Sequence, residues 1–318
     1  MNRHVLLLAL LCGCSVLGCR VPESAEAPVE TQPAIDVLAE ARAALEAADI
    51  QTLRWGLTPF FAADRLEERY APIIEHVSGR LGVPIELLVG DDYKDLEDRM
   101  VQGLIDVGVL GPYAYVRAHK RAPGLEVFAS HVAHGSLTYG AYIITREGSD
   151  LENLEGVRNQ SFGYVDRRST SGWLFPAARM LQEAIDPITG VDPRFLGSHD
   201  AVVDAIFAGE VVAGATYDGG LAEARARDTP ASGLRVLAKC ERIPYDAYVV
   251  RDGMPASVSL ALGQLLAEIS TRTQEGRAIL ANISRVNGFV PVDDSHYDTV
   301  RKVEAEVVAA LSKADAAP

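Results

Sequence analysis

The chain has 318 residues, with 30 Lys or Arg against 44 Asp or Glu, which gives a formal net charge of −14 at pH 7. Nucleic acid and anionic lipid repel so acidic a surface, so neither is expected as a partner. Hydrophobic residues make up 48% of the sequence, which is enough for a folded core, and the length suits two lobes of ordinary domain size.

The first residues have the pattern of an export signal. A basic start precedes an apolar run at residues 5–11 that is too short to span a bilayer, and Leu17-Gly18-Cys19 follows. That tripeptide resembles a bacterial lipoprotein cleavage box, in which the cysteine is lipidated; the alternative is a plain signal peptide with an incidental cysteine. We expect residues 1–18 to be removed and residues 19–50 to hold the lipidated Cys19 and a tether. Within this segment, residues 20–34 are rich in Pro, Glu and Ala, and residues 35–48 are expected to form a short helix. Only Cys240 then remains, so no internal disulfide is expected.

From residue 52 onward, strand-like and helix-like segments alternate, which is typical of an α/β sheet with crossover helices. The expected elements are strands at 53–57, 85–89, 106–110 and 126–130 and helices at 64–81, 96–103 and 113–119. In open sheets of this kind, ligands bind at the carboxyl ends of the strands. Thr58 and Phe60 follow the first strand, and Gly111-Pro112-Tyr113 follows the third, where Pro112 sets Tyr113 in a first helical turn.

Two strand-like segments about a hundred residues apart echo each other. Residues 141–146 and 247–251 both read Ala-Tyr, then aliphatic residues, and both end in Arg. Between them the alternation restarts, with strands at 161–165, 194–196 and 212–217 and helices at 173–184 and 199–208. We expect the echoing pair to be adjacent strands that cross between two lobes, each a mixed sheet flanked by helices; the alternative is a chance likeness of apolar strands. The predicted lobes are residues 51–142 with 249–318, and residues 143–248. The helix expected at 295–313 is predicted to pack on the first lobe.

Residues 168–175, Arg-Ser-Thr-Ser-Gly-Trp-Leu-Phe, place three successive hydroxyls where a strand turns into a helix. A helix start leaves N–H groups unpaired and carries the positive end of the helix dipole, and hydroxyls add further donors. Ser169, Thr170, Ser171 and Gly172 therefore form a candidate anion site. The alternative is that one hydroxyl is an ordinary N-cap and the others are loop residues.

A second helix start and a strand end are expected at the same rim. Ser198 is a candidate N-cap, which puts His199 in the first turn of the helix at 199–208. Tyr217 and Asp218 end the next strand. The alternatives are a surface histidine at position 199 and a helix-capping role for Asp218.

These residues resemble the phosphonate, phosphite and phosphate-binding proteins of ABC transporters, a branch of the two-lobed periplasmic binding proteins. The resemblance runs from about Trp55 to about Val292, and its motifs are Gly111-Pro112-Tyr113-Ala114-Tyr115, Ser169-Thr170-Ser171-Gly172 with Pro176, Gly197-Ser198-His199-Asp200-Ala201, Tyr217-Asp218 and Ile243-Pro244. It implies that the hydroxyl turn holds a phosphorus oxyanion, that His199 and Asp218 approach the ligand, and that Tyr113 and Phe60 line the cleft. We expect the complete site to be Thr58, Phe60, Tyr113, Ser169, Thr170, Ser171, Gly172, His199, Tyr217 and Asp218. Asp218 could accept a hydrogen bond from a protonated phosphorus oxygen or pair with a ligand amine. The sequence does not distinguish between these two roles.

The resemblance implies the substrate-binding component of an ABC importer, a monomer in the periplasm that is lipid-anchored at Cys19 and delivers a phosphorus oxyanion to an inner-membrane permease. The alternative is a sensor-type periplasmic binding protein for another small anion. Ser171, His199 and Asp218 are also the residue types of a hydrolytic triad. No Gly-x-Ser-x-Gly surrounds Ser171, and no metal or nucleotide motif appears in the sequence, so neither an enzyme nor a cofactor is expected.

Overall fold

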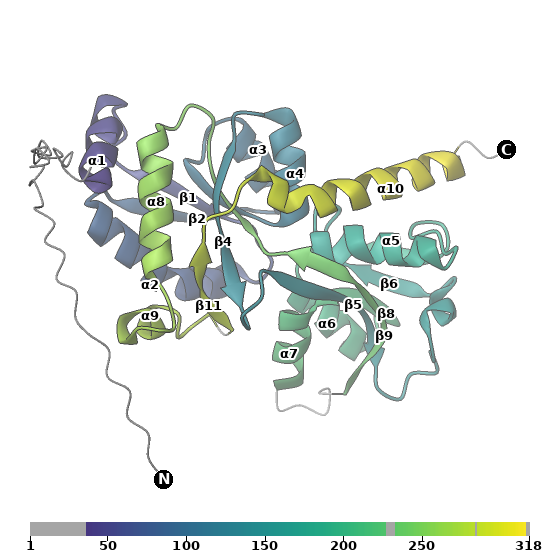
Figure 1. Ribbon diagram of the computed structural model, residues 1–318. Coiled ribbons are helices and arrows are strands. Elements are labelled where there is room, and N and C mark those ends of the chain that lie inside the picture. The colour runs from purple at the N-terminus through teal and green to yellow at the C-terminus, as the bar shows by residue number, and fades with distance from the viewer. Residues whose placement is uncertain (1–35, 227–232, 284, 316–318) are drawn as a thin grey trace, which may run out of the picture. The chain divides into compact units, whose positions relative to one another are not determined.

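The computed structural model describes residues 36–226, 233–283 and 285–315. The expected signal peptide, the lipidation site Cys19 and the tether up to residue 35 lie outside the described residues. Within them, the chain forms two α/β lobes, each built on its own sheet (Figure 1). The predicted fold class, two mixed sheets flanked by helices, is confirmed.

The first lobe contains a six-stranded sheet in the order β11-β4-β10-β3-β1-β2. Its strands are β1 (Leu53–Leu57), β2 (Ile85–Val89), β3 (Val107–Leu110), β4 (Glu126–Ala133), β10 (Ala247–Val250) and β11 (Val286–Val290). β1 pairs in parallel with β2 and β3, while β10 runs antiparallel between β3 and β4. The parallel pairing brings the carboxyl ends of β1 and β3 to one edge, as the sequence pattern predicts.

Helices cover both faces of this sheet. They are α1 (Val37–Ala47), α2 (Ala63–Leu81), α3 (Tyr93–Val101), α4 (Pro112–Arg121), α8 (Ala256–Glu268) and α9 (Gln274–Ile279). α1, α2 and α8 share one core with the fully buried Trp55 of β1, and α3 and α4 pack against each other in another. The short helix expected at 35–48 is confirmed as α1. Because α1 packs on α8, residues 37–47 belong to the lobe and not to the tether segment, which we had extended to residue 50.

The second lobe contains a five-stranded sheet in the order β7-β6-β8-β5-β9. Its strands are β5 (Thr138–Arg146), β6 (Ser161–Tyr164), β7 (Asp192–Phe195), β8 (Ala213–Tyr217) and β9 (Leu234–Pro244). Its helices are the 3-10 turn η1 (Leu154–Val157), the π-helical turn η2 (Thr170–Leu174), α5 (Phe175–Gln182), α6 (His199–Ala208) and α7 (Asp218–Ala226). η2 runs directly into α5, so the hydroxyl turn opens one continuous helical segment.

The echoing strands are not the crossing pair that we expected. β5 lies between β8 and β9 in the second sheet, whereas β10 lies between β3 and β4 in the first. The chain crosses between sheets after β4 and again between β9 and β10, a few residues before the expected boundaries at 142/143 and 248/249. The likeness has a simpler cause, since each is an interior strand whose residues are largely buried.

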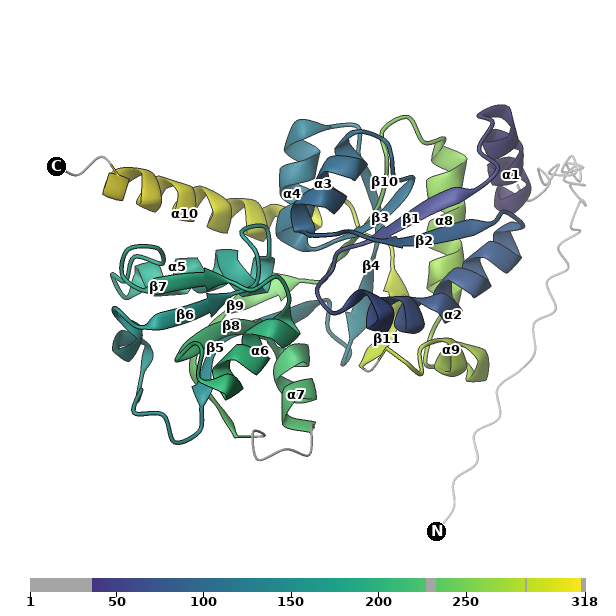
Figure 2. The ribbon, with the colours of Figure 1, turned by 180° about the vertical axis from the view of Figure 1, so that it is seen from behind.

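The C-terminal helix joins the two lobes. α10 (Asp298–Asp315) follows the short 3-10 turn η3 (Asp294–Tyr297) and packs against both α4 of the first lobe and α5 of the second. Figures 1 and 2 show it running from α4 along α5. The expected packing of this helix on the first lobe is therefore confirmed, and its packing on α5 of the second lobe was not expected. None of the helices in the described ranges is long and apolar enough to cross a bilayer.

Candidate ligand-binding site

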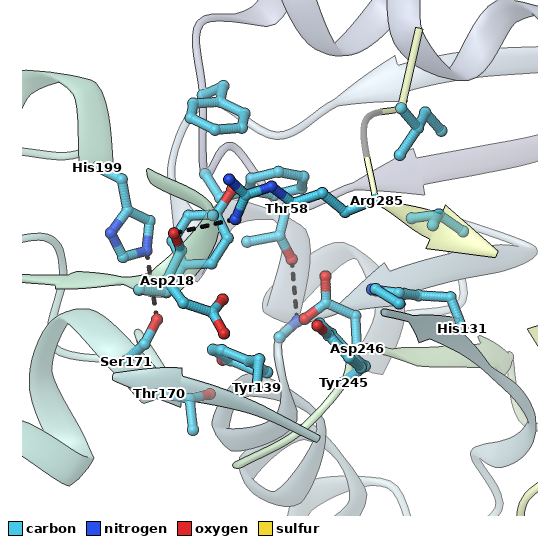
Figure 3. A pocket seen from close by; sticks show the side chains of 18 of the residues that line it. Thr58, His131, Tyr139, Thr170, Ser171, His199, Asp218, Tyr245, Asp246 and Arg285 are labelled. Atoms are coloured by element: carbon cyan, nitrogen blue, oxygen red, sulfur yellow. Dashed lines mark hydrogen bonds between the residues drawn. The ribbon is translucent and has the colours of Figure 1, made fainter. Parts of the chain in front are cut away.

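A cavity of about 120 Å³ lies between the lobes, where residues from both sheets' strand ends meet. That space is several times the ~10–15 Å³ that one water needs, so it suits a ligand of a few heavy atoms. Most of the expected site residues line it: Thr58, Phe60, Ser169, Thr170, Ser171, His199, Tyr217 and Asp218. Figure 3 shows Ser171 and His199 facing each other on one side and Asp246 and His131 on the other.

The hydroxyl turn is buried and ordered by its own hydrogen bonds. Ser169 precedes η2 in an extended conformation, and its Oγ accepts a hydrogen bond from the Gly172 N–H at 3.0 Å. Ser169, Thr170 and Ser171 are 2%, 3% and 4% exposed, so a ligand here exchanges water for protein donors alone. The first N–H groups of the turn have no intrahelical partner. The turn thus combines an N-cap, as one interpretation of the sequence predicts, with further hydroxyls that line the cavity; its role as an anion site stays a prediction.

Thr170 already bridges the lobes. Its Oγ1 accepts a hydrogen bond from the Tyr113 main-chain N–H at 2.9 Å, at the start of α4. The Phe60 carbonyl likewise accepts from the His199 N–H at 3.3 Å. These contacts join the hydroxyl turn and the start of α6 to the first lobe, so the structure is that of a closed cleft.

His199 is a neutral hydrogen-bonding group aimed at the turn. Burial lowers the pKa of His199 to about 3, so the ring carries no charge at neutral pH. Nδ1 lies 3.1 Å from the hydroxyl of Thr216, and Nε2 lies 3.4 Å from the hydroxyl of Ser171. If the Thr216 hydroxyl donates to Nδ1, Nε2 carries the proton and can donate to an oxyanion.

Asp218 is held away from His199. Its carboxylate accepts a hydrogen bond from the Gly140 N–H at 3.1 Å and lies 4.0 Å from the exposed Arg242 guanidinium. The partner of His199 Nδ1 is instead Thr216, so Ser171, His199 and Asp218 do not form a triad.

Thr58, Phe60 and Tyr217 form the walls of the cavity. The Thr58 hydroxyl donates to the Val109 carbonyl at 2.9 Å, which ties the ends of β1 and β3 together. The Tyr217 ring packs edge-on against His199 at a centroid distance of 4.8 Å and fixes the imidazole plane. Phe60 contributes an apolar ring, as expected.

Two expected site residues, Tyr113 and Gly172, do not line the cavity. Tyr113 is buried outside the cavity lining, with the Arg117 guanidinium 5.7 Å from its ring, and only its main-chain N–H faces the turn. Gly172 does not line the cavity either. A Cβ there would lie 2.3 Å from Val165 Cγ2, so this glycine lets the turn pack on β6's end. The Gly111-Pro112-Tyr113 motif correctly predicted a helix start that contacts the turn, but the Tyr113 side chain does not line the cavity.

Sequence reasoning missed two lining residues of clear chemical interest. Tyr93, at the start of α3, is 4% exposed; burial raises the pKa of its phenol, opposed in part by a hydrogen bond with the Ser169 side chain. Asp246 lies half-buried in the crossing between β9 and β10, and burial raises its pKa to about 7. Among the described residues its carboxylate has no hydrogen-bond or ion-pair partner. Asp92-Tyr93 after β2 could have been found as a helix start at the binding rim; Asp246 had no local signal beyond its place after Ile243-Pro244.

No group of three or more His, Cys, Asp or Glu side chains in the described part of the chain is arranged to hold a metal ion. The lining instead contains hydroxyls, a neutral imidazole, phenols and the unpaired Asp246 carboxyl group, together with the charged side chains of Arg69, Asp218, Glu223 and Arg285. Hydroxyl, imidazole and phenol groups can donate hydrogen bonds to a small oxyanion.

Two α/β lobes that close on a small polar cavity at their strand ends define a periplasmic solute-binding protein. Residues 55–297 match the family of periplasmic substrate-binding proteins of phosphonate ABC transporters. The chain belongs to this family, and the predicted resemblance is confirmed. It is the substrate-binding protein of a phosphonate or phosphate ABC transporter and, like its family, a binding protein rather than an enzyme.

Individual relatives agree with this assignment. The chain is 26% identical over 274 residues, 80% of this chain and 85% of the relative, to the phosphate-import protein PhnD of Mycolicibacterium smegmatis. Its fold is similar to a binding protein component of an ABC phosphonate transporter from Pseudomonas aeruginosa, with a TM-score of 0.74, 22% identity and 81% and 87% of the two chains covered. PhnD1 of Prochlorococcus marinus in complex with methylphosphonate is similar too, with a TM-score of 0.73, 17% identity and 81% and 98% covered.

Proposed function

We propose that the cavity between the lobes binds the phosphorus oxyanion of a phosphonate, phosphite or phosphate against the hydroxyl turn. The observation that carries this proposal is the set of three buried hydroxyls at the start of a helical segment, facing a neutral His199 and the unpaired Asp246. An anion is tolerated in such a place only if its oxygens receive hydrogen bonds.

The donors around the turn are sufficient for a three-oxygen group. The N–H groups of Thr170 and Ser171, the Ser171 hydroxyl, His199 Nε2 and the Tyr93 phenol are the candidate donors. None of these groups is a formal cation. The oxyanion is therefore held by local dipoles, in keeping with a chain whose net charge is −14.

We assign to Asp246 the role that the sequence left open for Asp218. A carboxyl group whose pKa is raised to about 7 shares a proton readily with a ligand that titrates in the same range. One proton between the Asp246 carboxyl and a ligand oxygen turns a repulsive pair into a hydrogen bond. Asp218, whose carboxylate already accepts from Gly140, is left beside the ligand's substituent.

Titration calorimetry with phosphite, phosphate, methylphosphonate and aminoethylphosphonate tests the proposal. Ser171→Ala should weaken binding by ~1.5–3 kcal/mol, because the lost hydrogen bond is to a charged group. Ser161→Ala is the matched control, since its Oγ accepts from the Val212 N–H within the second sheet, outside the cavity. If the wild type binds none of the four ligands, the ligand assignment is wrong; equal affinities of Ser171→Ala and wild type would remove the turn from the site.

We also propose that the protein acts as a monomer anchored by a lipid on Cys19, which the Leu17-Gly18-Cys19 pattern supports. Cys19→Ser should release the protein from membranes in cell fractionation, whereas Cys240→Ser should leave it attached. Membrane association that survives Cys19→Ser would show that another segment holds the protein.

A further inference from the structure

Arg285 is a cationic side chain in the ligand cavity and is not one of the proposed donors to the phosphorus group. It directly precedes β11 of the first lobe, is half-buried, and lines the cavity. Its main chain has a φ of 81°, in the left-handed region that side-chain-bearing residues rarely adopt. The His134 N–H donates to its carbonyl at 3.1 Å and helps hold this conformation. A strained residue at a ligand cavity points to a functional demand on that position.

The Arg285 guanidinium is poorly paired. Its Nη1 donates to the main-chain carbonyl of Asp218 at 3.3 Å, which is long for a hydrogen bond. A guanidinium has five N–H donors, so most of its capacity is unused. Across the ranges that the structure describes, Arg285 makes no ion pair with any carboxylate within 4.0 Å.

The other charged groups of the cavity already have partners or a role. Glu223 receives two hydrogen bonds from Arg69, at 3.2 and 3.0 Å, and one from Arg65 at 2.7 Å. Asp218 accepts from the Gly140 N–H. Asp246 is assigned to the phosphorus group above. Arg285 is therefore the charge for which the described cavity offers no counter-charge, and half-burial makes such a charge costly.

We infer that Arg285 binds a carboxylate carried by the organic substituent of the ligand, so that the ligand class is phosphonates with a carboxylate-bearing side group. A carboxylate matches the planar guanidinium through two parallel hydrogen bonds. Figure 3 shows Arg285 on the far side of Asp218 from Thr170 and Ser171, where a substituent leaving the hydroxyl turn would reach it. The inference rests on the proposed function, because the phosphorus group must occupy the turn.

Titration calorimetry compares phosphonoacetate and 3-phosphonopropionate with ethyl- and propylphosphonate, whose substituents carry no charge, in wild type and Arg285→Gln. The wild type should bind the carboxylate-bearing phosphonates about tenfold or more tightly than the alkylphosphonates, because a hydrogen bond between charged groups contributes at least that much to affinity. Arg285→Gln should remove this preference and leave the affinity for ethylphosphonate within about twofold. Arg242→Gln is the matched control, because Arg242 is exposed and approaches Asp218 without lining the cavity; it should keep the preference.

Three outcomes overturn the inference. If the wild type binds the alkylphosphonates as tightly as the carboxylates, Arg285 does not read the substituent, although the proposed function stands. If Arg285→Gln weakens both classes equally, the guanidinium acts on the phosphorus group or on closure. If the wild type binds phosphite or phosphate but no phosphonate, the inference fails and the proposed function stands; if it binds none of these ligands, both fail.

Discussion

The carboxylate of Glu97 in the first lobe lies 3.0 Å from the Arg168 guanidinium of the second lobe, one residue before the hydroxyl turn. The Glu97 side chain is fully buried and also contacts Arg117 at 3.2 Å and Arg121 at 2.7 Å. Two arginines of α4 thus hold a carboxylate in place, and that carboxylate holds Arg168. The contact joins the two lobes beside the turn, so we expect it to stabilise the closed arrangement and to hold the turn in position.

Removing this contact should weaken ligand binding, although neither Glu97 nor Arg168 lines the cavity. For Arg168→Gln we expect a loss of about 1–2 kcal/mol, or roughly 5–30-fold in affinity for methylphosphonate, because the closed state loses a buried charge-assisted hydrogen bond. Arg167→Gln is the control, since Arg167 packs over Trp173 and Phe195 within the second lobe. Equal effects of the two substitutions in calorimetry would show that the Glu97 contact does not support closure.

A second set of charges closes the other side of the cavity. Arg65 and Arg69 of α2 pair with Glu223 of α7, and Arg65 also contacts Asp200 of α6. These side chains are partly exposed, so each pair is worth less than ~1 kcal/mol. Glu223→Gln should therefore weaken binding by no more than about fivefold. Glu183→Gln, which loses a pair with Arg179 inside the second lobe, should change nothing; a comparable loss there would point to a general charge effect.

Asp246 should make the stability of the ligand-free protein depend on pH. Burial raises its pKa from 3.8 to about 7. Between pH ~4 and ~7 the folded chain keeps a proton that the unfolded chain has lost, so this group's contribution to stability falls as the pH rises. Asp246→Asn cannot ionise, so its Tm should match wild type near pH ~4 and exceed it increasingly up to pH ~7. A Tm difference that is constant over this range would contradict the buried carboxyl.

Gly172 should tolerate no side chain. A Cβ at this position would lie 2.3 Å from Val165 Cγ2 and 2.8 Å from Ser169 Oγ. Gly172→Ala should thus destabilise the protein by about 1–3 kcal/mol in urea unfolding and displace the turn. Gly79→Ala in α2 meets nothing within 4 Å, so it should be neutral or stabilising. If the two variants unfold alike, the close packing of the turn is not what the structure indicates.

Much of this architecture follows from local patterns. The alternation of strands and helices predicted nearly every element, and the helix expected at 199–208 has those bounds in the structure. Ser169 to Ser171 and His199 could be selected because helix starts at strand ends have a sequence signature. Their convergence on one cavity follows from the parallel order of β6, β7 and β8.

The remainder depends on contacts between distant segments. Asp246 and Arg285 sit in irregular segments, and nothing in their neighbours along the chain indicates that both line a cavity. Residues 141–146 and 247–251 have similar sequences because both strands are buried on both faces, although they belong to different sheets. This similarity led to the wrong prediction that they are adjacent crossing strands. Tyr113 was chosen for its ring, yet its contribution is a main-chain N–H that any residue except proline supplies.

The central claim is that a phosphorus oxyanion sits between the hydroxyl turn, His199 and Asp246. A crystal structure of the protein with methylphosphonate tests it most directly. We predict phosphonate oxygens within hydrogen-bonding distance of Ser171 Oγ, His199 Nε2 and the Asp246 carboxyl group. A ligand-saturated crystal in which methylphosphonate lies elsewhere, and these three side chains contact only water, would contradict the account.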